Sequence, residues 1–274
     1  MNYAITGAAG SIGSALSNRL RDENRLLIDI DETRLHYLWM GTGGTPLLCD
    51  IRDQDALDRA FRAFKPDVVI HAAAYKHVPF LERFPEEAVK TNVLGTANVV
   101  EASIANGVKK FVLISTDKAA NSVCVMGRTK ALAERVAVNA AGRGLHTKVV
   151  RFGNVYGTRG SVVPLFERQI AEGGPVTVTH PEVTRYFIDM EQAVGLILCS
   201  IGIGESGDIL MLDMGEPHLI KSLAEDMIGD RDIEVVYTGL RPGEKLHEDL
   251  VSEQEVLVPV REGIFRVLDK GVWG

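Results

Sequence analysis

The sequence predicts a doubly wound parallel α/β sheet followed by a smaller C-terminal lobe. Short apolar runs alternate with amphipathic stretches, glycines stand at the first strand-to-helix turn, and the alternation loosens after about residue 154 into Gly-Pro turns and short strands. Such alternation is typical of right-handed βαβ units. We expect strands at residues 3–6, 25–30, 45–48, 67–71, 110–114 and 147–152. We expect helices at residues 11–22, 32–40, 53–64, 85–106, 125–142, 191–200 and 217–228.

Composition and charge limit the class of protein. Of the 274 residues, 46% are hydrophobic and 24% are charged, so the chain can bury a full core. A net charge of −7 argues against a general nucleic-acid binder, which needs clustered Lys and Arg. The first residues resemble a strand and not a signal peptide, and no apolar run approaches the roughly 20 residues of a transmembrane helix. We therefore expect a cytoplasmic protein without a membrane span.

The three cysteines, Cys49, Cys124 and Cys199, lie far apart and form no CxxC pattern. This spacing indicates neither a disulfide framework nor a metal site. We expect small core side chains in a reducing compartment and no bound metal.

A glycine-rich turn, TGAAGSIG, follows the first expected strand. Glycines there allow a tight turn, the close approach of a pyrophosphate and close packing of helix on strand, while the helix N-terminus offers free N–H groups to the anion. The pattern predicts a Rossmann-type dinucleotide site. Its expected contacts are Gly7, Ala9, Gly10, Ser11, Ile12 and Gly13.

An acidic residue closes the second expected strand. Asp29 lies about 20 residues beyond the glycine turn, where a carboxylate accepts a hydrogen bond from a ribose 2′-hydroxyl. A carboxylate also repels a 2′-phosphate, so NAD is favoured over NADP. The alternative is that Asp29 only begins the acidic start of the next helix.

Residues after the third and fourth strands could complete the cofactor site. Asp50 and Ile51 could flank an adenine, with the carboxylate on its exocyclic amine; the alternative is a cap for the helix at 53–64. The fourth strand ends in small side chains that leave room for a cofactor, or that simply pack closely. These small residues are Ala72, Ala73 and Ala74.

Polar residues follow the fifth expected strand, at the edge where parallel sheets bind ligands. Thr116, Asp117 and Lys118 supply a hydroxyl, a carboxylate and an amine, and Lys130 adds a second amine on the next helix. Adjacent residues on an extended segment point to opposite sides, so an ion pair between Asp117 and Lys118 is not automatic. We expect the chemistry of the protein to lie in this segment.

Motifs cover nearly the whole chain, from Tyr3 to about Val251. They are TGAAGSIGSAL, HAAAYKHVP, KTNVLGTANV, STDKA, MGRTK, RFGNVYG, GSVVPLF, VTHPEVTRYF and LRPGEKLHEDL. Together they resemble the extended short-chain dehydrogenase/reductase superfamily and, within it, the CapD-like UDP-N-acetylglucosamine 4,6-dehydratases of polysaccharide biosynthesis. The first motif is shared by many families, whereas STDKA, GSVVPLF, VTHPEVTRYF and LRPGEK are far more specific.

The resemblance implies a cycle with no net oxidation. A bound nicotinamide cofactor supplies the hydride chemistry at C4 of the sugar, and the 4-ketone acidifies the C5 proton. A base removes that proton while an acid helps the C6 hydroxyl leave as water, and the hydride returns to C6. The product is a UDP-linked 4-keto-6-deoxy sugar, and the family includes members that retain and members that invert C5.

The resemblance also assigns roles to the segment after the fifth strand. Asp117 would be the acid at the C6 oxygen, Lys118 the base at C5, and Thr116 a hydrogen-bond partner of the C4 oxygen. Lys130 would hold the nicotinamide ribose. A lysine is a base only where burial or a nearby cation lowers its pKa, which we expect for Lys118 beside Lys130. The alternative is a loop ion pair between Asp117 and Lys118.

One position departs from the wider superfamily. Where a tyrosine is expected four residues before the active-site lysine, this chain has Met126. A thioether cannot exchange protons, so the C4 hydroxyl needs another acceptor, such as Asp117, or Thr116 through water. A methionine is familiar here among the dehydratases that the chain resembles, so the enzyme hypothesis stands.

The loop after the fourth strand and the next helix add candidates. Lys76 is expected to line the active site and to contact the cofactor or the sugar, with Tyr75 and His77 in reach, although a lone histidine is more often structural. The resemblance implies that the Asn92 side chain bonds backbone beside the active site. The alternative is a solvent-facing Asn92.

The second half of the chain carries groups that suit a UDP-sugar. Arg185 and Arg241 would pair with the diphosphate, because a planar guanidinium suits phosphate oxygens, and Glu244 would hold the uridine ribose. Asn154 would contact the diphosphate or the sugar, and Val162 lies at a helix start that faces an anion. Taken singly, such arginines are more often surface ion-pair partners.

These motifs divide the chain into two expected parts. Residues 1–153 form a dinucleotide-binding domain and residues 154–274 a mixed α/β substrate-binding lobe, interleaved without a clean boundary. The end, 262–274, is expected to be a brief β-like tail without chemistry. The resemblance implies a homo-oligomer that associates through the helices at 85–106 and 125–142.

Three functions remain open, with a UDP-N-acetylglucosamine 4,6-dehydratase that binds NAD as the leading hypothesis. A UDP-hexose 4-epimerase would use the same fold, hydride and cofactor, but it needs no C5 base or C6 acid and ordinarily keeps the tyrosine. A non-catalytic redox sensor would bind the dinucleotide but would have no use for LRPGEK or the arginines of the lobe.

Overall fold

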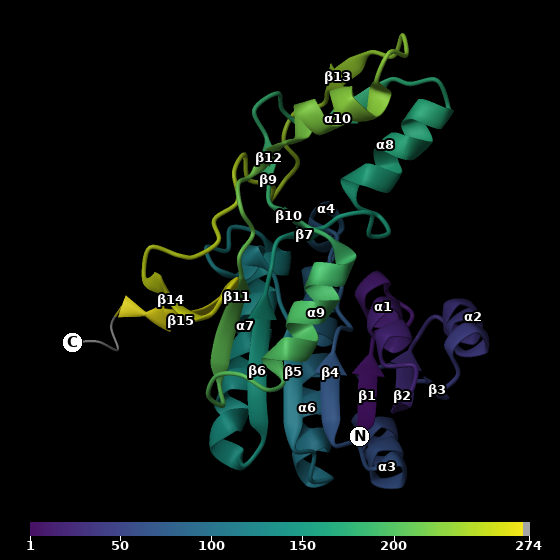
Figure 1. Ribbon diagram of the computed structural model, residues 1–274, viewed down its shortest axis with the longest axis vertical. Coiled ribbons are helices and arrows are strands. Elements are labelled where there is room, and N and C mark those ends of the chain that lie inside the picture. Colours follow the sequence, from purple (N-terminus) through teal and green to yellow (C-terminus); the bar gives the residue numbers. More distant parts are fainter. Residues whose placement is uncertain (271–274) are drawn as a thin grey trace.

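A computed structural model describes residues 1–270 of the chain (Figure 1). Its centre is a nine-stranded sheet in the order β14-β15-β11-β6-β5-β4-β1-β2-β3. The strands from β3 to β11 run parallel, and β15 and β14 add an antiparallel edge. This confirms the predicted doubly wound parallel sheet. The strands are β1 (Asn2–Thr6), β2 (Asn24–Asp29), β3 (Thr45–Leu48), β4 (Val68–His71), β5 (Lys110–Ile114), β6 (His146–Arg151), β11 (Asp208–Leu212), β14 (Glu255–Arg261) and β15 (Ile264–Asp269).

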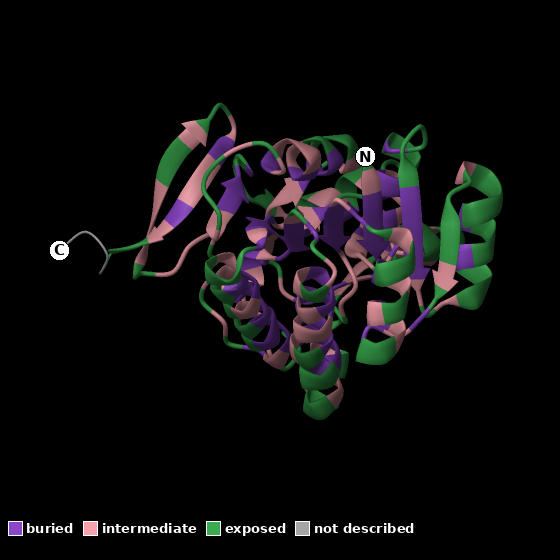
Figure 2. Ribbon diagram, turned by 90° about the horizontal axis from the view of Figure 1, so that it is seen from below, coloured by how far each residue is buried: buried purple, intermediate pink, exposed green. Residues whose placement is uncertain are grey.

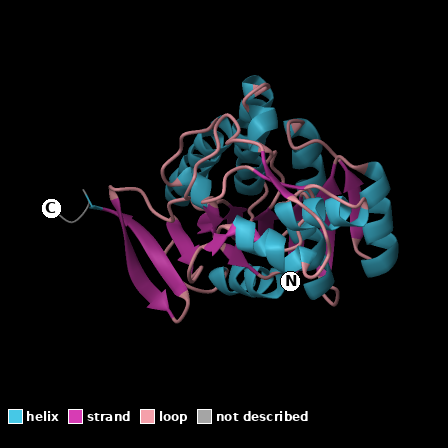
Figure 3. Ribbon diagram, turned by 90° about the horizontal axis from the view of Figure 1, so that it is seen from above, coloured by secondary structure: helices cyan, strands magenta, loops and turns pink. Residues whose placement is uncertain are grey.

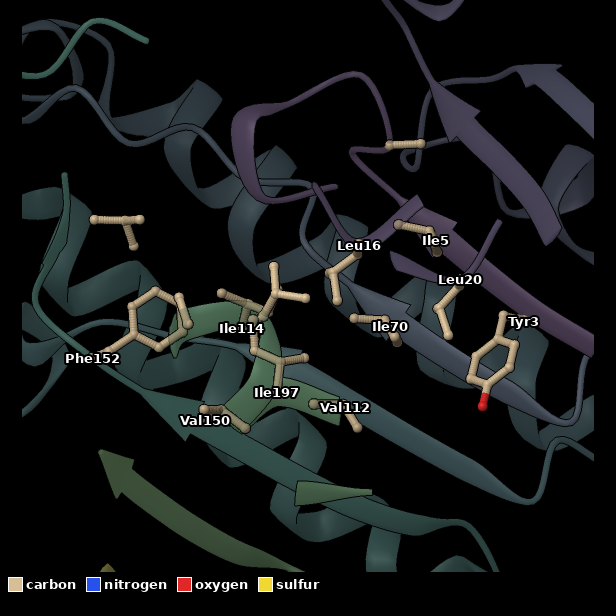
Figure 4. Close-up of a cluster of buried hydrophobic side chains, with 14 of the residues drawn as sticks. Tyr3, Ile5, Leu16, Leu20, Ile70, Val112, Ile114, Val150, Phe152 and Ile197 are labelled. Carbon is tan, nitrogen blue, oxygen red and sulfur yellow. The ribbon is translucent and has the colours of Figure 1, made fainter. Parts of the chain in front are cut away.

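Helices cover both faces of this sheet. They are α1 (Ser11–Arg19), α2 (Glu32–Thr42) and α9 (Met190–Ser200) on one face, and α3 (Gln54–Phe64), α6 (Thr96–Ala105) and α7 (Val125–Ala140) on the other. Ala4 and Ile5 are neighbours on β1 but enter opposite clusters, because successive strand side chains alternate. Figure 4 shows Ile5 packed with Leu16 of α1 and, further along the cluster, Ile197 of α9. Burial on both faces explains why these strands are continuous apolar runs in the sequence.

The helix expected at 85–106 contains a π-helical turn. The structure has α4 (Val78–Leu81), α5 (Pro85–Ala88) and then a π-helical segment, Val89–Gly95, before α6 begins. The π-helical segment carries Asn92, whose side chain bonds backbone outside the helix. Such segments are frequent at functional sites. The expected helix is therefore present from Pro85 to Ala105, and what the sequence did not predict is the π-helical turn where it meets the active-site loop.

The C-terminal lobe lies beyond the carboxyl edge of the sheet, at the top of Figure 1. Its core packs α8 and α10 against the short pair β13-β8, with Phe166 and Val176 fully buried. Two more short pairs, β10-β7 and β12-β9, complete it. Its elements are β7 (Asn154–Val155), α8 (Val162–Ala171), β8 (Val176–Val178), β9 (Thr184–Arg185), β10 (Phe187–Ile188), β12 (His218–Leu219), α10 (Ile220–Ile228) and β13 (Val235–Tyr237).

The second half of the chain also contributes to the large sheet. β11 pairs with β6, so a boundary between residues 153 and 154 would separate paired strands. The hairpin β14-β15 projects from the edge of the molecule and is much less buried than the central strands (Figures 2 and 3). The tail predicted at 262–274 therefore forms β15 as far as Asp269, and its last four positions lie outside the described residues. Within residues 1–270, no helix is both long and apolar enough to cross a membrane.

Candidate active site

The glycine turn between β1 and α1 has no room for side chains. Gly7 adopts φ +66°, and a Cβ there would lie 2.7 Å from the Ala73 backbone nitrogen. Gly10 is the N-cap of α1 and provides no side-chain cap, so the first N–H groups of the helix stay available to a ligand. This cradle of bare backbone fits the pyrophosphate of a dinucleotide.

A cavity of about 660 Å³ runs from this turn along the carboxyl edge of the sheet to the end of β5. It brings most of the predicted cofactor and catalytic residues together, with Met126 in its wall. The predicted residues that line it are Gly7, Gly10, Ser11, Ile12, Gly13, Ala72, Ala74, Lys76, Thr116, Lys118, Lys130 and Asn154. Those that do not line it are Ala9, Asp29, Asp50, Ile51, Ala73, Asn92, Asp117, Val162, Arg185, Arg241 and Glu244.

Asp29 is held at the start of the glycine turn. Its Oδ2 accepts a hydrogen bond from the Ala9 N–H at 2.8 Å, and its Oδ1 accepts one from Asp31 at 3.0 Å. Each carboxylate oxygen can accept more than one bond, so both can still receive a ribose hydroxyl. Arg34, which sequence reasoning missed, lines the same cavity and pairs with Asp31 at 3.1 Å.

Asp50 and Ile51 are engaged elsewhere. The Arg52 guanidinium bonds Asp50 at 2.6 Å and holds the pKa of that carboxyl below its usual value. Ile51 packs under the π-helical segment, where a Cβ on Gly95 would lie 2.6 Å from it. The alternative role of a cap for α3 is wrong, because Asp53 caps that helix by accepting a bond from Ala56. A contact with adenine stays a prediction.

The residues after β5 form one hydrogen-bonded group. Thr116 Oγ1 donates to Asp117 Oδ1 at 2.8 Å, and Lys118 Nζ donates to the same oxygen at 3.0 Å. Asp117 is 1% exposed, and its Oδ2 has no hydrogen-bond partner among the described residues. The Asp117–Lys118 ion pair therefore exists, contrary to the expectation for an extended segment, because Asp117 begins a 3₁₀ turn (Asp117–Ala119) that turns both side chains to one side.

The pKa values of the two lysines are shifted in opposite directions. Burial lowers the pKa of Lys118, but the Asp117 and Glu248 carboxylates outweigh it and leave the pKa above the ordinary value. The expected lowered pKa of Lys118 is therefore wrong for this structure. Lys130 has the lowered value instead: burial reduces its pKa to about 8 despite Glu134, and its Nζ donates to the Ile114 carbonyl at 2.6 Å.

Asn92 ties the loop after β4 to α7. Its side-chain oxygen accepts a bond from the Tyr75 N–H at 2.8 Å, and its nitrogen donates to the Tyr75 carbonyl at 3.0 Å and to Thr129 at 3.1 Å. Asn92 is buried, so a solvent-facing side chain is excluded. Thr129 precedes Lys130, and the contact fixes α7 beside the cavity.

Lys76 links the two halves of the site. Its Nζ donates to the Arg159 carbonyl at 2.7 Å, and burial together with the Arg159 guanidinium lowers its pKa. Arg159, also missed from the sequence, reaches the glycine turn, where its backbone N–H donates to Ser11 at 3.1 Å and its guanidinium donates to the Ala9 carbonyl. His77 lies against this loop, 2.7 Å from where a Cβ on Gly160 would stand, and it lines both this cavity and a second, smaller one.

A second cavity, of about 180 Å³, lies on the lobe side of Lys118. Arg185 is buried there and donates to Glu244 at 2.9 Å, while Glu244 accepts a further bond from the Arg241 N–H at 3.2 Å. All three predicted substrate residues of this group line the cavity. Val162 lies outside both cavities, but its neighbour Ser161, the N-cap of α8, lines the larger one.

Glu248 is the second carboxylate on Lys118, and sequence reasoning missed it. Its Oε1 lies 3.4 Å from Lys118 Nζ and 3.8 Å from Arg185 Nε. It stands four residues after Glu244 in LRPGEKLHEDL, and this repeat of the carboxylate is the signal that could have found it. Glu248 comes close to Lys118, in the turn after β5, only when the chain is folded.

A buried charge network lies behind the site. Ser115, next to Thr116, donates to Glu134 at 2.5 Å, and Arg151 donates to Glu134 at 2.7 Å. The other arm of Arg151 donates to Glu255 of β14 at 2.8 Å. The side chains of Arg151 and Glu134 are each 4% exposed. The segment that carries Thr116 is thus connected to the edge hairpin.

The chain matches the family model described as polysaccharide biosynthesis protein over residues 3–267. It is 42% identical over 270 residues to the probable polysaccharide biosynthesis protein EpsC of Bacillus subtilis, a match that covers 92% of this chain and 45% of EpsC. The chain therefore spans about half the length of that relative.

Solved structures share the fold. Pen from Bacillus thuringiensis is similar with a TM-score of 0.89 at 33% identity, over 98% of this chain and 86% of that one. The UDP-glucose 4-epimerase of Thermus thermophilus, in complex with NAD, gives a TM-score of 0.80 at 26% identity, over 91% of this chain and 90% of that one. With the family model matched over nearly the whole chain, and the motif-based resemblance thereby confirmed, this protein belongs to the polysaccharide biosynthesis protein family.

Proposed function

We propose that this protein is a nucleotide-sugar 4,6-dehydratase that acts on UDP-N-acetylglucosamine with a bound nicotinamide cofactor. One observation carries the proposal: the buried Asp117 carboxyl has one oxygen free and is in contact with the Thr116 hydroxyl and the Lys118 amine. Elimination across C5 and C6 needs a base at C5 and an acid at the C6 oxygen, whereas hydride transfer at C4 alone needs only an acceptor for the C4 hydroxyl proton.

The Thr116–Asp117 hydrogen bond offers a path for the proton that Met126 cannot take. The nicotinamide supplies the acceptor that takes the C4 hydride and returns it to C6. Thr116 passes the C4 hydroxyl proton to the Asp117 carboxylate, which then holds it as the acid. Asp117 delivers the same proton to the C6 hydroxyl, which leaves as water. The proton lost from the C4 hydroxyl and the proton gained by the C6 hydroxyl therefore balance on one carboxyl group.

The two lysines take the remaining roles. Lys118, as a neutral amine, removes the C5 proton and gives a proton back to C5 when the hydride adds to C6. Because its pKa is raised, it rests as an ammonium and must first lose a proton. Lys130 holds the nicotinamide ribose, and with a pKa of about 8 it carries its positive charge at neutral pH. That charge, beside the Ile114 carbonyl, stabilises negative charge that develops at the C4 oxygen.

NAD is the proposed cofactor. Asp29, fixed at the glycine turn, accepts ribose hydroxyls and disfavours a 2′-phosphate. The structure of the Thermus thermophilus 4-epimerase with NAD supports this choice. Arg34 is the group on which NADP binding would depend, and a comparison of NAD and NADP affinity for the wild type and Arg34→Gln tests the assignment.

The diphosphate is proposed to bind Arg185 and Arg241, with Glu244 on the uridine ribose. Arg185 already bonds Glu244, so the diphosphate competes with this carboxylate for the guanidinium. The rim of the smaller cavity thus exchanges an internal ion pair for a charge-assisted bond to substrate.

An NMR time course with UDP-N-acetylglucosamine in D₂O, without added reductant or oxidant, tests the proposal. A new C6 methyl signal with deuterium at C5 supports dehydration, and the ring couplings report inversion or retention. The assay uses the full-length protein, including any segment that lies outside these 274 residues. An unchanged substrate, despite bound NAD, would count against this sugar and favour the non-catalytic redox sensor.

A 4-epimerase is the second candidate, because the chain is similar in fold to the UDP-glucose 4-epimerase of Thermus thermophilus. The same spectra separate the two activities, because an epimerase gives the 4-epimer and no methyl signal. A homo-oligomer and a cytoplasmic location stay predictions of the sequence.

A further inference from the structure

Glu248 has no assigned role in the proposed cycle, although it lies beside Lys118. Its side chain is 5% exposed and lines the smaller cavity. Among residues 1–270, two cations lie within 4 Å of its carboxylate: Lys118 from the turn after β5 and Arg185 from β9. The Cys124 thiol, at the start of α7, also interacts with it.

Lys118 needs a proton acceptor before it can act. An ammonium has no lone pair, so Lys118 must lose one proton before it takes the C5 proton. Asp117 cannot serve, because it receives the C4 proton through Thr116 and gives it up at C6. The other carboxylate at Lys118 Nζ is Glu248, at 3.4 Å.

We propose that Glu248 primes Lys118 by taking its resting proton. One N–H bond of the ammonium breaks, one O–H bond forms on Glu248, and the ion pair becomes a neutral amine beside a neutral acid. No electrons are exchanged, and the same proton returns to Lys118 when the cycle ends. This inference rests on the proposed function, because only elimination at C5 uses Lys118 as a base.

Arg185 connects this step to substrate binding. Its guanidinium lies 3.8 Å from Glu248 and stabilises the charged carboxylate. When a diphosphate draws Arg185 away, Glu248 loses part of that stabilisation and accepts a proton more readily. The base is thereby released only in a loaded site.

The test compares Glu248→Gln, Glu248→Asp and the control Asp249→Asn, whose carboxylate is exposed and pairs with Lys245. At pH 7 we expect kcat of Glu248→Gln to fall about 100-fold with KM unchanged, since an amide cannot take the proton. Added acetate should restore part of kcat, and kcat should rise with pH as hydroxide replaces the carboxylate. Glu248→Asp should lose about 10-fold and respond to acetate, and Asp249→Asn should match the wild type.

Two results would overturn the inference. If Glu248 acted only through its charge, Glu248→Gln would lower the Lys118 pKa, and activity at pH 7 would be equal or higher and insensitive to acetate. If Glu248 were structural, kcat and KM would both worsen without rescue, and Glu248→Asp would share the defect. Wild-type protein assayed in parallel separates the two proposals: no methyl product from it overturns the proposed function as well, whereas normal wild-type turnover with an unimpaired Glu248→Gln overturns this inference alone.

Discussion

The glycine turn and the smaller cavity are built in different ways. Around Gly7 the binding surface is backbone, fixed by φ and by the absence of Cβ atoms. Around Arg185 the surface consists of side-chain charges that already neutralise one another. A backbone cradle is complete before its ligand arrives, whereas an ion-pair cluster must be rearranged by the ligand. We expect the backbone cradle to contribute affinity for the dinucleotide, and the ion-pair cluster to couple binding of the diphosphate to the chemical step.

The largest effect is expected for a substitution at Asp117, at the centre of the ion-pair cluster. Asp117→Asn removes the proposed acid and should lower turnover about 1,000-fold, within the range for a positioned acid or base. NAD affinity, measured by calorimetry, should stay at the wild-type value because Asp117 lies outside the larger cavity. More than a tenth of wild-type turnover would contradict the role of Asp117.

The variant Lys130→Met tests the difference in pKa between the two lysines. The Lys130 amine donates to a carbonyl, whereas the Lys118 amine lies beside two carboxylates. The pKa of Lys130 falls from 10.5 to about 8, which corresponds to a free-energy difference of about 3 kcal/mol between its protonated and neutral forms. Between pH 8 and 10.5 the unfolded chain binds more protons at this residue, so this residue's contribution to the free energy of unfolding rises with pH. Denaturant titrations at about pH 7 and about pH 10.5 should show a rise of about 3 kcal/mol for the wild type relative to Lys130→Met. An equal pH response in both proteins would contradict the lowered pKa.

On the backbone side, Gly7→Ala should abolish the cradle. The added Cβ would lie 2.7 Å from the Ala73 nitrogen at φ +66°, and a strain of about 3 kcal/mol would weaken NAD binding about 100-fold. Gly107→Ala is the matched control, because Gly107 has φ +68° but open space around its Cβ. It should cost about 1 kcal/mol of stability and leave NAD affinity unchanged. The same NAD affinity in both variants would contradict the role of the close contact at Gly7.

A smaller effect is expected for Arg185→Gln. Losing one charge-assisted bond to the diphosphate should weaken UDP binding about 10-fold, while NAD affinity stays the same. Arg143→Gln is the control, since that arginine forms an exposed pair with Glu101. Unchanged UDP affinity in Arg185→Gln would place the diphosphate elsewhere.

The same contrast explains what could be predicted from the sequence. The parallel sheet and the glycine turn depend on neighbouring residues, so periodicity and spacing revealed them. The pairing of Asp117 with Lys118 depended on a 3₁₀ turn that no local pattern announced. Glu248 depends on a contact between segments far apart in the chain, and its effect on the Lys118 pKa could not be read from either segment alone.

The hairpin β14-β15 has a consequence for how this chain can be shortened. The recognisable motifs end near Val251, before the hairpin, so a cut there would remove no motif. It would also remove Glu255 and expose one arm of Arg151, whose other arm fixes Glu134 and, through it, Ser115. The hairpin therefore helps to hold Ser115, the residue next to Thr116, and a chain cut near Val251 would keep every family motif but lose this contact.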